Sequence, residues 1–191
     1  MANMRFSQTL VYAAGAVAFL WLVHMALWVL PLEPGDLGIM PRAARGLRGI
    51  ILAPFAHADL AHLAANSGPL FVLLAAALLL DTGRTIAATV LIIVVGGALV
   101  WIFGGDGSHI GASGVVFGLA GFLGLYGILR RSILSLAVSV GVVVVYGSML
   151  VMLFRNQAGV SWSSHFFGFA AGLGAAWLLG KVFRADVSGG E

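Results

Sequence analysis

Residues 107–129 read GSHIGASGVVFGLAGFLGLYGIL, a run of 23 positions without Asp, Glu, Lys or Arg. A helix needs roughly 20 apolar residues to cross the hydrocarbon core of a bilayer, so this run is long enough to span. Five further uncharged runs of at least 21 residues cover 6–32, 60–80, 85–105, 132–154 and 156–180. The pattern predicts an all-α membrane protein, a bundle of six transmembrane helices.

The composition favours the same class. Hydrophobic residues make up 61% of the chain and charged residues 9%, whereas a soluble domain carries roughly 25% charged residues. Lipid offers no hydrogen bonds to the backbone, so helices are expected rather than open sheets. The sequence has no cysteine, which excludes disulfides and thiolate metal sites. No basic patch with interleaved aromatic residues is present, so nucleic acid is not an expected partner.

The positions of charges and helix breakers predict the organisation of the chain. We expect one domain over residues 1–184 and a disordered, polar tail over 185–191. The long connection before residue 59 is rich in Pro and Gly, and 43–52 within it is expected to form a short interfacial helix. The six helices are expected at approximately 10–30, 59–80, 85–103, 113–129, 132–154 and 162–183.

Positive charge in short loops predicts the orientation of the bundle. With both termini in the cytoplasm, six of the ten basic residues lie inside: Arg5, Arg84, Arg130, Arg131, Lys181 and Arg184. The other four lie outside: Arg42, Arg45, Arg48 and Arg155. The excess favours N-terminus and C-terminus inside, and the basic loops favour contact with anionic lipid headgroups.

A candidate nucleophile lies at the start of the run quoted above. Ser113 stands where the loop gives way to a helix, between Gly111 and Gly114. A serine at this place is often only a helix cap. The two glycines, however, permit a tight turn and clear space around the hydroxyl, and free amides at a helix start can bind a developing oxyanion.

A candidate base lies at the start of the last apolar run, in SWSSHFFG over residues 161–168. Ionisable side chains inside membrane segments are costly and usually mark function. His165 is therefore a candidate general base. The alternative is a structural histidine that hydrogen-bonds to a neighbouring helix.

A third polar group lies at the start of the second run, in FAHADLAHLAAN over residues 55–66. His62 and Asn66 are four residues apart and share one helix face. Both can donate hydrogen bonds, which suits an oxyanion hole. A metal site of His57, Asp59 and His62 is the alternative, but this spacing does not place all three on one face.

These groups are expected to lie at one membrane depth. In an up-and-down bundle the second, fourth and sixth helices run in the same direction. Ser113, His165 and the His62–Asn66 pair all lie near the starts of those helices. The sequence therefore predicts one polar site just below a membrane surface.

Over residues 50–180 the sequence resembles the rhomboid family of intramembrane serine proteases. The resemblance rests on the 55–66 segment, on GASGVVFG over 111–118 and on the spacing of His165 from Gly168 and Gly172. It implies a Ser113–His165 dyad, with His62, Asn66 and the Ser113 amide holding the oxyanion. It also implies a six-helix bundle in a bacterial-type plasma membrane, open to the non-cytoplasmic side, that cleaves transmembrane protein substrates without metal or cofactor.

Two departures from the family pattern are visible. Phe117 stands where the family often has tyrosine, which keeps the aromatic wall against the histidine and loses a hydroxyl. The first loop lacks the family's Trp-Arg pair, so Arg42, Arg45 or Arg48 is expected to anchor it instead. The alternative functions are a catalytically silent rhomboid-like protein that binds membrane helices and, third, a transporter or channel.

Overall fold

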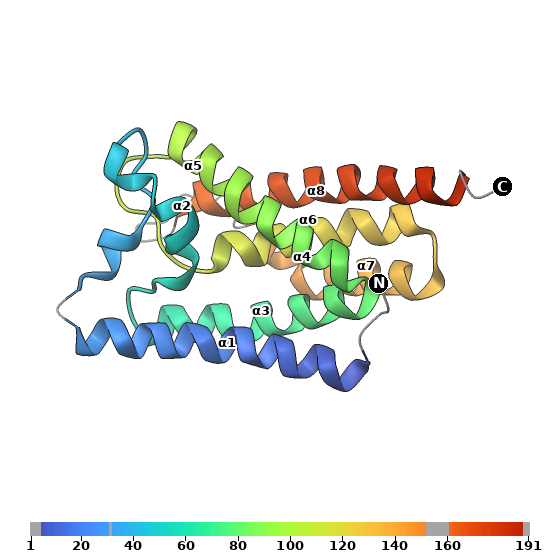
Figure 1. The fold of residues 1–191 in the computed structure, drawn as a ribbon, viewed down its shortest axis with the longest axis horizontal. Coiled ribbons are helices and arrows are strands. Elements are labelled where there is room, and N and C mark those ends of the chain that lie inside the picture. Colours follow the sequence, from blue (N-terminus) through green and yellow to red (C-terminus); the bar gives the residue numbers. More distant parts are fainter. Residues whose placement is uncertain (1–4, 31, 152–160, 189–191) are drawn as a thin grey trace.

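The computed structural model describes residues 5–30, 32–151 and 161–188 (Figure 1). It contains five long helices: α1 (Phe6–Val29), α3 (Leu60–Leu80), α6 (Ser113–Arg130), α7 (Ile133–Leu150) and α8 (Trp162–Ser188). A further rod is continuous from α4 (Thr82–Leu91) through a π-helical turn, η4 (Ile92–Gly96), into α5 (Gly97–Phe103). The described residues form no β-strand beyond one isolated bridge between Ile39 and His109. The all-α fold is confirmed.

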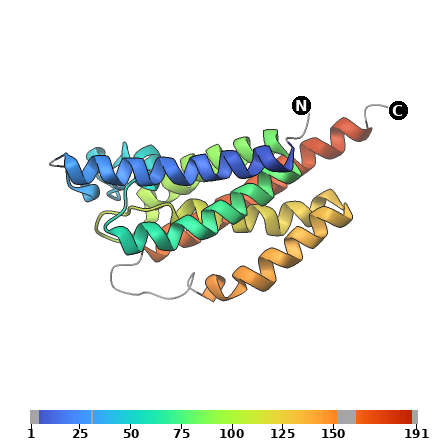
Figure 2. The same cartoon turned by 90° about the horizontal axis from the view of Figure 1, so that it is seen from below.

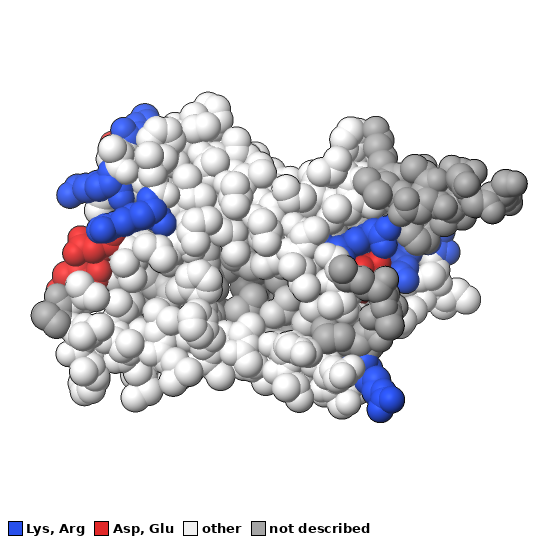
Figure 3. Space-filling view, in the orientation of Figure 1, with Lys and Arg blue, Asp and Glu red and all other residues white. Residues whose placement is uncertain are grey.

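Among the described residues, four helical segments are long and apolar enough to cross a membrane: α1, α3, the rod Thr82–Phe103 and α6. Residues 133–148 of α7 form a shorter apolar helix. In Figure 3 the charged side chains gather near the two ends of the visible face, with an uncharged region between them. This distribution of charge fits a protein embedded in lipid. The number of six transmembrane helices stays a prediction.

Helix starts follow local capping. Asp59 accepts the His62 amide at 2.7 Å, so α3 begins at residue 60, one residue after the predicted start. Asp81 accepts the Arg84 amide at 3.0 Å, and α4 therefore begins at Thr82 rather than at 85. A capping carboxylate satisfies amides that the first helical turn leaves without partners.

Helix α8 continues to Ser188, beyond its predicted end at residue 183. The disordered tail over residues 185–191 stays a prediction. Residues 181–188 contain neither Gly nor Pro, so nothing in them breaks the helix. Residues 189–191, and the 152–160 segment that covers the predicted end of the fifth helix and Arg155, lie outside the described residues.

The long connection forms short turns instead of one interfacial helix. These are η1 (Pro34–Leu37), η2 (Ala44–Gly46), α2 (Gly49–Leu52) and η3 (Ala53–Phe55). Arg42 anchors the connection, with Nη1 donating to the Gly104 carbonyl at 2.8 Å and Nη2 to Asp106 at 2.9 Å. The loop is thus tied to the segment that leads into α6.

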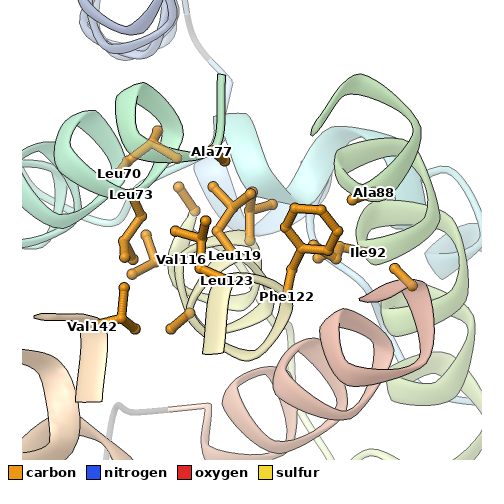
Figure 4. Packing of buried hydrophobic residues seen from close by; sticks show 14 of the residues in the cluster. Leu70, Leu73, Ala77, Ala88, Ile92, Val116, Leu119, Phe122, Leu123 and Val142 are labelled. Carbon is orange, nitrogen blue, oxygen red and sulfur yellow. The ribbon is translucent and has the colours of Figure 1, made fainter. Parts of the chain in front are cut away.

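The helix α6 lies at the centre of the bundle. Figures 1 and 2 show α3, α6 and α8 running in the same direction, with α7 against α6 on one side. Apolar residues of α6 pack toward α3, α4 and α7, as Figure 4 shows. The labelled members of this core are Leu70, Leu73, Ala77, Ala88, Ile92, Val116, Leu119, Phe122, Leu123 and Val142.

The contact between α6 and α8 is backbone against backbone. A Cβ atom on Gly168 would collide with the Gly114 carbonyl, and one on Gly172 with the Gly118 carbonyl. The second contact lies four residues after the first on both α6 and α8. The two helices therefore run parallel in a fixed register. Small residues at this spacing allow close helix approach in membranes.

Candidate active site

The loop before α6 holds Ser113 in a defined position. Gly111 has φ +108°, a conformation that suits glycine, and its amide donates to the Ala53 carbonyl at 2.9 Å. The next amide, that of Ala112, donates to His57 Nε2 at 3.2 Å. Ser113 then begins α6, where the first amides have no acceptor within the helix. These amides are available to an anion.

His165 lies opposite Ser113 on α8. The side chain is 6% exposed and stacks on Phe117, with ring centroids 4.3 Å apart and an interplanar angle of 21°. Ser113 and Phe117 are four residues apart, so they lie on the same face of α6, the face that packs against His165. The Ser164 carbonyl, next to His165, lies 3.3 Å from the place a Gly114 Cβ would occupy. Ser113 and His165 therefore stand at the same end of two touching helices.

Ser113 and His165, both within the described residues, do not hydrogen-bond to each other in this structure. Catalytic hydrogen bonds are often loose without substrate. His165 Nδ1 is buried and has no partner among the described residues. Phe117, rather than a carboxylate, is thus the neighbour that orients the imidazole.

His62 and Asn66 reach the same loop from α3. A Cβ on Gly111 would lie 2.6 Å from His62 Nε2 and 3.8 Å from Asn66 Nδ2. Asn66 is 6% exposed and uses one amide hydrogen on the carbonyl of His62, at 2.9 Å. The Asn66 amide nitrogen and the His62 ring thus lie against Gly111, two residues before Ser113. The structure therefore brings Ser113, His165, His62 and Asn66 together, as the shared helix direction predicts.

His57 has a role that the sequence pattern did not reveal. Its side chain is fully buried, and Nε2 accepts the Ala112 amide. Burial, followed by the nearby His62, lowers the pKa of His57 from its usual 6.5 to about 4. The imidazole is therefore neutral at pH 7, as an acceptor must be. From its position in the 55–66 segment, His57 was expected only as a possible metal ligand.

A small cavity of about 40 Å³ borders the Ser113 loop. Gly111, Gly114 and Ser164 contribute to its wall, with Ile92 and Val100 on the apolar side. Ser113 and His165 do not line this cavity, which lies between the Ser113 loop and the α5 side of the bundle.

Comparison with known proteins places this chain in a family. A Rhomboid domain model matches residues 44–182. Uncharacterized proteins of Mycobacterium tuberculosis and Mycobacterium bovis are each 38% identical over 156 residues, which cover 77% of this chain and 65% of theirs. One of Mycobacterium leprae is 35% identical over 147 residues, covering 72% of this chain and 58% of its own.

The chain thus spans less than two thirds of the length of these relatives. The family match itself covers most of the present chain, including α3, α6 and the described site residues. With its apolar helices, this match identifies the chain as a member of the rhomboid family of integral membrane proteins.

Proposed function

We propose that this chain is an intramembrane serine endopeptidase that cleaves transmembrane segments of other proteins. Ser113 is the nucleophile and His165 is the base. The observation that carries the proposal is the parallel, glycine-mediated contact of α6 and α8, which sets Ser113 and the Phe117-stacked His165 at one end. Family membership supports the same chemistry.

In the first step His165 takes the Ser113 hydroxyl proton while Oγ attacks the carbonyl carbon of a peptide bond. Nε2 is the acceptor, because Nδ1 is sealed inside the protein. The negative charge that develops on the carbonyl oxygen is stabilised by His62, Asn66 and the Ser113 amide.

The tetrahedral species collapses when the peptide C–N bond breaks. The leaving amine takes the proton from His165, and the acyl group stays on Ser113 Oγ. A water molecule, deprotonated by His165, then attacks the acyl carbon. The bond from that carbon to Ser113 Oγ breaks, Oγ takes the proton back from His165, and the carboxylic acid product leaves. The substrate segment has to be unwound at this point, because an intact helix shields its own carbonyls.

The proposal includes an orientation in a bacterial-type plasma membrane. The α1 start and the α8 end lie at the same end of the bundle, opposite the starts of α3, α6 and α8 (Figure 1). The excess of basic residues near that end favours the cytoplasm. The Ser113 site then opens to the non-cytoplasmic side.

The test is cleavage of a model transmembrane substrate in liposomes by the parent, Ser113→Ala, His165→Ala and the double variant. Because a dyad acts as a unit, the double variant should be little worse than either single variant. Binding of the substrate without cleavage by the parent would favour the silent helix-binding alternative.

A further inference from the structure

A hydrogen bond links the two chain segments that carry the candidate dyad. His109 Nδ1 and Ser161 Oγ lie 2.5 Å apart. His109 precedes Ser113 by four residues, and Ser161 precedes His165 by four. The bond therefore connects the loop before Ser113 with the start of α8. Each of its two residues lies four positions before a residue of the candidate dyad.

The proton positions in this bond follow from its neighbours. His109 Nε2 lies 2.8 Å from the Gly105 carbonyl oxygen, which can only accept, so Nε2 carries a hydrogen. In the neutral ring Nδ1 is then the acceptor, and the Ser161 hydroxyl donates its one hydrogen to it. Ser161 Oγ also lies 2.6 Å from Ser164 Oγ, so in this arrangement the Ser164 hydroxyl donates to Ser161. Ser161 Oγ also accepts the Ser164 amide at 3.2 Å, which caps the first turn of α8.

The backbone of His109 is held as firmly as its ring. Its amide donates to the Ile39 carbonyl at 2.9 Å, and its carbonyl accepts the Ile39 amide at 3.0 Å. The side chain is 8% exposed in total. His109 thus joins three segments: the long connection, the loop before α6 and the start of α8.

We propose that His109 and Ser161 are positioning residues that fix the distance between Ser113 and His165. The inference rests on the proposed function. Near the site, α6 and α8 meet through Gly114 and Gly168, and this contact contains no side-chain hydrogen bond. The polar link between His109 and Ser161 holds the loop before α6 against the start of α8. A misplacement of 1 Å in an active site costs about 10²-fold in rate.

The ring nitrogens allow a matched pair of substitutions. In His109→Asn the amide oxygen stands near the place of Nδ1 and keeps the acceptor for Ser161. In His109→Gln the amide nitrogen stands near Nε2 and keeps the Gly105 contact, and the Ser161 acceptor is lost. Ser161→Thr keeps the hydroxyl, and Ser161→Ala removes it.

The kinetic test is kcat, KM and melting temperature for these four variants. We expect His109→Gln and Ser161→Ala to lose on the order of 10- to 100-fold in kcat, with KM nearly unchanged. The melting temperature should change little in His109→Gln and should fall in Ser161→Ala, which also loses the cap of α8. His109→Asn and Ser161→Thr should stay within a few-fold of the parent. The double variant His109→Gln/Ser161→Ala should be no worse than Ser161→Ala alone, since Ser161→Ala already removes the bond that His109→Gln removes.

A spin-label distance gives a readout independent of activity. The chain has no cysteine, so Gly105→Cys and Trp162→Cys can be labelled alone. A side chain at Gly105 meets open space, and Trp162 is 36% exposed. We expect the distance distribution between the labels to broaden in His109→Gln and Ser161→Ala but not in His109→Asn.

Unchanged distributions in His109→Gln and Ser161→Ala would overturn the positioning role, as would multiplicative losses in the double variant. One outcome is that the parent fails to cleave a substrate and to react with a serine-directed probe while the distance distribution still broadens in His109→Gln. In that case the proposed protease function fails and the structural link stands. The two failures are therefore distinguishable.

Discussion

Phe117 lies parallel to the His165 ring at a centroid distance of 4.3 Å. Phe117 is 2% exposed, so the surrounding core fixes its ring and, through it, the imidazole. We expect Phe117→Ala to lower kcat on the order of 10- to 100-fold, because His165 gains other rotamers. Phe117→Tyr keeps the ring and should cleave within a few-fold of the parent. Parental cleavage by Phe117→Ala would mean that another group holds the histidine.

The glycine contact of α6 and α8 predicts a difference between two positions on α8. Gly172→Ala places a Cβ against the Gly118 carbonyl, whereas at Gly174 a Cβ meets no atom within 4 Å. We expect Gly172→Ala to cost about 1–3 kcal/mol of stability through overpacking. Gly174→Ala should melt at or slightly above the parent, because alanine favours helix. Equal melting temperatures of the two variants would argue against this packing.

Stability should depend on pH through His57. Its pKa is lowered from 6.5 to about 4 by burial and by His62. The folded state therefore binds this proton less readily than the unfolded state, so His57 lowers stability as pH falls from about 6.5 toward 4.

The measurement is the melting temperature of the parent and of His57→Gln at each pH. Gln can accept the Ala112 amide and does not titrate, so its melting temperature should fall less over that window. Parallel curves for the two proteins would show that His57 is not the group responsible.

Asn66 tests transition-state stabilisation apart from folding. Among the described residues, its side chain hydrogen-bonds only to the His62 carbonyl of the same helix, so its loss breaks no hydrogen bond between helices. We expect Asn66→Ala to lower kcat by up to about 10²–10³ if Asn66 is a full oxyanion donor, and by less where His62 compensates. KM and the melting temperature should change little. A lower melting temperature with kcat preserved would remove Asn66 from the site.

Much of the fold was predictable because lipid leaves few choices. A charge-free run of spanning length has to be a helix, and the helices appear over the predicted runs. The π-helical turn Ile92–Gly96, the anchoring by Arg42 and the continuation of α8 to Ser188 depend on local packing and weak end signals. Periodicity and charge counts do not contain that information.

The candidate site was also predictable only in part. Ser113, His165 and Asn66 stood out because polar side chains are rare in apolar helices. The His109–Ser161 hydrogen bond joins residues 52 positions apart in the sequence. No motif around either residue predicts that the other is its partner. His57 was visible as a possible ligand, but its bond to the Ala112 amide follows from tertiary contact. Among the residues that orient others, Phe117 was predictable from the sequence, whereas the contacts of His57, His109 and Ser161 follow only from the structure.

The central claim is that Ser113 is a nucleophile activated by His165. The most direct measurement is covalent labelling by a fluorophosphonate probe, with the modified residue located by mass spectrometry of peptides. The account predicts one adduct, on Ser113, absent from Ser113→Ala and from His165→Ala although both variants keep the parental helical content. Labelling of Ser113→Ala at the parental rate, or an adduct on another serine, would contradict it.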